Sequence, residues 1–98
     1  MKLLGRSSDS DVVNLNESFK NYDAIYVSSF FRNNNTRSTT MVSTSIFAFS
    51  EDINVGDNIV FVEESAYDKW YRSFLTISSE TSFKTNIKYY TTVIGINL

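Results

Sequence analysis

The chain has 98 residues, a net charge of −2, and no histidine, cysteine or proline. Histidine is the usual proton shuttle and metal ligand at neutral pH, and cysteine is the usual soft nucleophile, so their absence removes most routes to catalysis and favours binding. The nine basic residues form no run, which makes nucleic acid a poor candidate partner, and no stretch approaches the roughly 18 apolar residues of a membrane span.

The length predicts one domain, and the many aromatic and β-branched residues favour strands over helices. Residues 1–11 contain the polar stretch Gly5–Asp11 and are predicted to form a linker or neck segment. The domain itself is expected to span 12–98. Its first short strand, 12–15, is interrupted by Asn14, which is typical of a sheet edge.

Two longer strands are expected next. Residues 22–31 have apolar side chains on both faces, with Ile25 and Val27 on one face and Tyr26 on the other, so both faces should be covered. Residues 32–37 have the composition of a hairpin turn. Residues 38–49 then alternate to give one apolar and one hydroxyl-rich face.

The second half of the chain continues this pattern. A turn at 55–58 precedes a buried strand at 59–62, and a short helical turn is possible at 65–69. Further strands are predicted at 70–78, 83–90 and 91–98, with a turn at 78–82. Seven short strands at this spacing are typical of an all-β antiparallel β-sandwich or small barrel, and we predict the sandwich.

One aromatic cluster is a candidate binding site. Trp70, Tyr71 and Arg72 have the composition of both binding hot spots and sugar-stacking platforms. Tyr89 and Tyr90 are neighbours on one predicted strand, so one of the two rings must face away from the core. The alternative for all of these residues is packing in the core or at a contact between subunits.

The predicted hairpin turn is a second candidate. Asn33, Asn34 and Arg37 combine hydrogen-bond donors and acceptors suited to a hydroxyl-rich ligand, although a turn also favours Asn for backbone reasons. Carboxylate pairs such as Glu63 and Asp68 are most simply explained as solvated turn residues. No serine lies in a nucleophile motif, and no cofactor or metal site is expected.

Three short segments are similar to a known family. The sequences Asn21–Val27, Phe74–Phe83 and Val93–Leu98 resemble the C-terminal receptor-binding domains of bacteriophage tail fibres. The resemblance covers the chain from about residue 11 to the end, except for residues 32–69. It implies a β-sandwich head at the tip of a homotrimeric fibre, which binds a bacterial surface glycan or an outer-membrane protein.

The expected function is therefore non-enzymatic host attachment. The protein would be made in the bacterial host cytoplasm and located in the virion, at the tail-fibre tip, with no membrane insertion. A thin core with apolar residues on both faces of several strands would also gain from burial against sister subunits. Two alternatives stay open, a structural virion or tail assembly protein without receptor contact and a small glycosidase that uses two acids.

Overall fold

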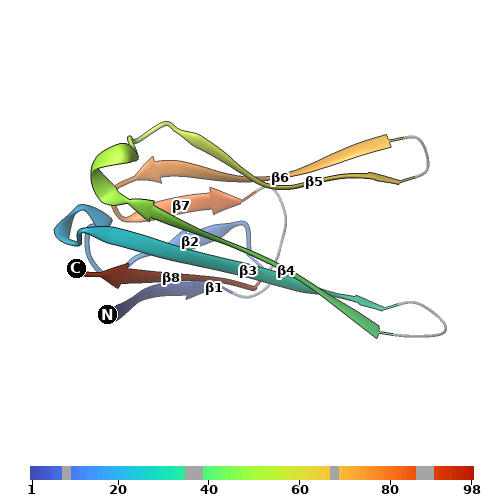
Figure 1. Ribbon diagram of the computed structural model, residues 1–98, viewed down its shortest axis with the longest axis horizontal. Helices are drawn as coiled ribbons and strands as arrows, with labels where there is room; N and C mark the ends of the chain where they lie inside the picture. The colour runs from blue at the N-terminus through green and yellow to red at the C-terminus, as the bar shows by residue number, and fades with distance from the viewer. Residues whose placement is uncertain (8–9, 35–38, 67–68, 86–89) are drawn as a thin grey trace.

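The computed structural model describes residues 1–7, 10–34, 39–66, 69–85 and 90–98, with the backbone alone for 31–34, 39–43, 61–66 and 69–73. The described chain is all-β, as predicted, and forms two antiparallel sheets of four strands each (Figure 1). The first sheet has the order β1 (Lys2–Ser7), β8 (Tyr90–Ile96), β3 (Ala24–Asn34), β4 (Thr39–Phe49). The second sheet has the order β2 (Val12–Asn14), β7 (Ser82–Thr85), β6 (Lys69–Ser79), β5 (Asn58–Ala66).

The first strand corrects the prediction of a linker at residues 1–11. Lys2–Ser7 pairs with β8, and the ladder shifts its register between Leu3 and Gly5. Leu4 is only 1% exposed and belongs to the core, whereas Leu3 is 53% exposed. One buried leucine and a row of backbone hydrogen bonds are enough to hold a strand whose other residues are mostly polar or exposed, so the described chain has eight strands instead of the predicted seven.

Most of the other predicted strands are confirmed. The burial predicted for the strand at 59–62 is wrong at Val60, which is 46% exposed because β5 lies at a sheet edge. Val12–Asn14 lies at a sheet edge, and β3 and β4 form the predicted antiparallel hairpin. A helical turn over 65–69 does not match the described residues, because Ser65 pairs with Trp70 across the β5–β6 hairpin and Ala66 pairs with Lys69, while 67–68 lie outside the described part of the chain. Cross-strand hydrogen bonding outweighs the weak local preference of these residues for a helical turn. Tyr90 begins β8 instead of ending the preceding strand, and residues 86–89 lie outside the described part of the chain.

The core lies between the two sheets and is closed at one end by two 3-10 turns, η1 (Phe19–Asn21) and η2 (Ser50–Asp52). Phe19 and Phe83 are fully buried and meet edge to face, with ring centroids 5.5 Å apart. The largest fully buried side chains come from both sheets and from η1: Phe19, Phe83, Leu4, Ile25, Leu75, Ile77, Val13, Val27 and Val93.

The faces of β3 and β4 only partly match the prediction. Ile25 and Val27 are buried as expected, but Tyr26 on the opposite face is 36% exposed, so none of the described segments fully covers that face there. On β4 the predicted alternation is present. However, its outward face carries the exposed rings of Phe47 and Phe49 beside Ser45, so it is not simply hydroxyl-rich.

The two hairpins are longer than the sandwich. Among the described residues, the β3–β8 ladder ends where Phe30 pairs with Tyr90, and residues 31–34 of β3 pair with 39–42 of β4. Similarly, the described β6–β7 ladder starts at Leu75, and residues 69–73 of β6 pair with 62–66 of β5. We call these two-stranded extensions the first arm and the second arm. Both project from the same end of the molecule, which measures 44 × 23 × 22 Å (Figure 1).

Candidate functional site

Five of the seven predicted binding residues lie on the two arms. Asn33 and Asn34 belong to the first arm, where they pair with β4. Trp70, Tyr71 and Arg72 belong to the second arm, where they pair with β5. The backbone thus brings residues that are about 35 positions apart in the chain to the same end of the molecule (Figure 1). The remaining two, Arg37 and Tyr89, lie outside the described residues.

The interior becomes polar where the arms begin. Ser29 of β3 and Thr91 of β8 are buried partners in the sheet register, and their hydroxyl oxygens are 3.0 Å apart. Ser7 of β1 pairs with Thr91, and its buried hydroxyl has no hydrogen-bond partner among the described residues. Thr85, the last residue of β7, is also buried. Sequence reasoning did not predict this group of buried hydroxyl side chains. Serine and threonine occur throughout the strands, and the local sequence does not indicate which of them come together in the folded sheets.

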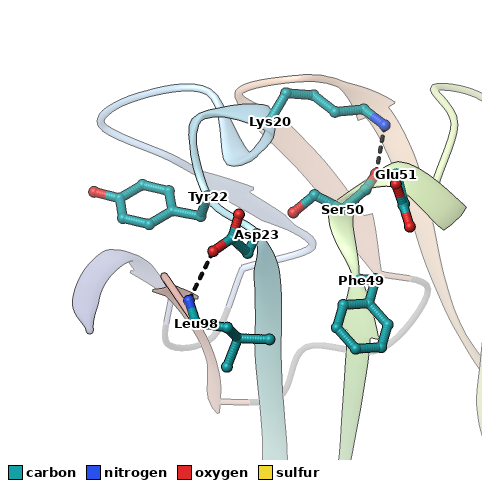
Figure 2. Close-up of a pocket in the computed structure, with 7 residues that line it drawn as sticks. All are labelled: Lys20, Tyr22, Asp23, Phe49, Ser50, Glu51 and Leu98. Atoms are coloured by element: carbon teal, nitrogen blue, oxygen red, sulfur yellow. Dashed lines mark hydrogen bonds between the residues drawn. The ribbon is translucent and has the colours of Figure 1, made fainter.

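A pocket lies at the opposite end of the molecule. It has a volume of about 450 Å³ and is lined by residues of η1, η2 and the chain end. Figure 2 shows the lining residues, which are Lys20, Tyr22, Asp23, Phe49, Ser50, Glu51 and Leu98.

The charged groups of this pocket hold the local fold together. The Lys20 ammonium donates to the main-chain carbonyl of Ser50, the first residue of η2 (Figure 2). It also donates to the carbonyl of Ile53, just after η2. The Asp23 carboxylate accepts a hydrogen bond of 2.7 Å from the Leu98 main-chain N–H. No group of three or more acidic residues in the described part of the chain could hold a metal ion.

The ring of Tyr22 is fixed by a close approach to β8. A Cβ atom at Gly95 would lie 2.6–2.8 Å from three carbons of the Tyr22 ring, so only glycine fits beneath it. Burial raises the pKa of the Tyr22 phenol, with a further contribution from the nearby Glu17 carboxylate. Glu17 also accepts a hydrogen bond from Lys2, 2.5 Å away. This cluster ties β1 to the segment before η1 and is structural.

The ion pair between Lys2 and Glu17 predicts a small pH dependence of stability. The hydrogen bond from Lys2 lowers the pKa of Glu17 and raises that of Lys2. A lowered carboxyl pKa stabilises the fold above the pKa of the unfolded chain, and this contribution is lost as the pH falls through the folded value. Glu17→Gln should therefore lower Tm slightly at pH 7 and leave it unchanged at pH 2, as measured by thermal unfolding. An equal loss at both pH values would contradict this account.

The outer face of the first sheet carries an exposed apolar patch. The register places Phe47, Tyr26, Ile94 and Leu3 in one row across β4, β3, β8 and β1. Three members are at least one third exposed, with 51% for Phe47, 36% for Tyr26 and 53% for Leu3. Phe49 packs edge to face on Phe47, with ring centroids 5.5 Å apart. Single apolar residues on a surface are ordinary, whereas a contiguous uncharged row of this kind is typical of an interaction surface.

Comparisons with known proteins give no match to a family model, to a curated protein or to a solved structure. The resemblance to tail-fibre tips therefore stays a prediction. Among the described residues, no helix has the length and hydropathy needed to cross a membrane.

Proposed function

We propose that this chain is a non-enzymatic receptor-binding module of a phage tail fibre or phage-like particle, and that its two arms recognise a bacterial surface glycan. The observation that carries the proposal is the position of the arms. In the described part of the chain, two β-ribbons leave one end of a compact sandwich, and they carry Asn33, Asn34, Trp70, Tyr71 and Arg72.

The geometry favours recognition at the arms for two reasons. An isolated two-stranded ribbon is only marginally stable in water, so arms of this length are best explained by a partner that they contact. Their residue types also suit a sugar, because indole and phenol rings stack on the apolar faces of sugars while amide and guanidinium groups bond to hydroxyls.

Binding at one such site is weak, and attachment would depend on several copies acting together. Linked copies raise the effective concentration of the second site without any new contact. We therefore propose a homo-oligomer within the virion. The resemblance implies three copies, and the number is tested directly below.

Glycan binding measured on arrays and on whole host cells tests this proposal. Trp70→Ala and Tyr89→Ala should each weaken binding by about tenfold or more, since loss of one stacked aromatic costs about 1–3 kcal/mol in comparable ligand contacts. Tyr26→Ala is the matched control, because Tyr26 is an exposed aromatic of the sandwich body and should leave binding unchanged. Absence of binding to every array and to host cells would overturn the proposal.

A structural assembly protein is the second candidate, and the exposed apolar row across the first sheet favours it. Such a row would be covered by a neighbouring protein in a shell or tube. Labelling the chain in intact particles separates the two candidates. A distal position supports receptor binding, and an internal position supports assembly.

A further inference from the structure

The edge strand β4 differs from the other three sheet edges. It is eleven residues long, Thr39–Phe49, and contains no charged residue, no proline and no glycine. Its register with β3 is unbroken over all eleven pairs, from Ala24 with Phe49 to Asn34 with Thr39. In the sheet order of the described strands β4 pairs with β3 alone, so its other side faces no described strand of the first sheet.

The other edges carry the features that prevent strand addition. β1 contains Lys2 and Arg6 and has a register shift at its centre. β5 contains Glu63 and Glu64 and has a register shift after Val60. β2 is only three residues long. Charges, bulges and short length are the means by which natural sheets block pairing with another chain, and a long, regular, uncharged edge promotes it.

We propose that β4 is a dimerisation edge, which pairs antiparallel with β4 of a second copy to form one continuous eight-stranded sheet. A second copy is the occupant that fits best, because two-fold pairing places identical strands against each other and like charges would then repel. β4 has no charge to repel its own copy, whereas β1 and β5 would each oppose like charges. The net charge of −2 per chain adds little repulsion.

This pairing also accounts for the exposed rings on β4. If the whole strand is used, its midpoint lies at Thr44, and the register sets Phe47 opposite position 41 of the second copy and Phe49 opposite position 39. Both rings are about half exposed in the single chain, at 51% and 45%. Pairing would cover part of each ring. The β4 edge of each copy would then be fully paired. Because the remaining edges are protected, the assembly closes at two copies instead of growing.

Ser45 provides the test. It is exposed on the outward face of β4 and lies one residue from the proposed midpoint, so the two copies would be diagonal neighbours about 7–8 Å apart. We expect the wild-type chain to have the mass of two copies by light scattering over a concentration series. Ser45→Lys should raise the dissociation constant at least about tenfold through like-charge repulsion. Mixing Ser45→Lys with Ser45→Glu should restore the dimer.

The matched control is Val60→Lys, which adds the same charge to the exposed edge strand β5 and should leave the dimer intact. Amide hydrogen exchange gives a second measurement, since amides of Thr39–Phe49 should exchange more slowly as concentration rises. A monomer at every concentration, a three-copy mass or a dimer unaffected by Ser45→Lys would each overturn the proposal. No arm residue is changed, so the glycan contacts of a single copy stay intact, and failure of the dimer can be told apart from failure of those contacts.

Discussion

Phe83→Ala is expected to lower the free energy of unfolding by about 3–5 kcal/mol, the usual cost of removing a buried aromatic ring from a core. Phe83 is fully buried on β7, between Val13 of β2 and Ile77 of β6 in the sheet register. Its ring also meets Phe19, which closes the end of the sandwich. A small core has few other contacts that could offset this loss, so the variant should be close to unfolded at 37 °C.

This effect is measured by urea unfolding of the wild type, Phe83→Ala, Phe19→Ala and the double variant. The two single changes should be non-additive by about 0.5–1.5 kcal/mol, the coupling typical of an edge-to-face aromatic pair. Val55→Ala is the control, because Val55 lies in the turn before β5, is 53% exposed, and its loss should leave the midpoint nearly unchanged. Equal effects at positions 55 and 83 would contradict the assigned core.

Gly5→Ala is expected to destabilise the fold by about 1–3 kcal/mol, in the range found for overpacked sites. A Cβ atom at Gly5 would collide with the main-chain carbonyl oxygen of Asn14 and would lie 3.0 Å from Leu15 Cδ2. The carbonyl belongs to the backbone and cannot turn aside as a flexible side chain could. The alternative is to move β1, which would break the hydrogen bond from Asn16 N–H to the Leu4 carbonyl.

Denaturant unfolding and hydrogen exchange together test this prediction. Gly5→Ala should shift the unfolding midpoint and speed amide exchange in the paired residues of β1 and β8. Arg6→Ala, at the exposed neighbouring position on the same strand, should do neither. If Gly5→Ala were neutral in both measurements, residues 1–7 would behave as the linker that the sequence predicts, and the close crossing of β1 and β2 would be wrong.

The candidate site could be predicted only in part. The aromatic and amide composition of Trp70–Arg72 and Asn33–Asn34 indicates binding residues, but their common location depends on two hairpins that leave the same end of the sandwich. The pocket around Lys20 gave no signal in the sequence, because its members are spread from η1 to the chain end and meet through the packing of η1 against η2 and the hydrogen bond between Leu98 and Asp23. The absence of charged residues from β4 can be read in the sequence, but the position of β4 at the edge of the sheet cannot.

The sequence by itself determined that this protein is built from strands. Alternating β-branched and aromatic residues suit a pleated surface, and this preference acts between neighbouring residues, so it can be read locally. The tertiary structure decided which strands pair, which faces are covered and which edges remain open. Leu4 makes β1 part of the fold because β1 pairs with β8, and Phe47 is exposed because no described segment fully covers the outer face of β4 at that position. Both outcomes depend on residues distant in the chain, since pairing and burial are set by the partner and not by the strand alone.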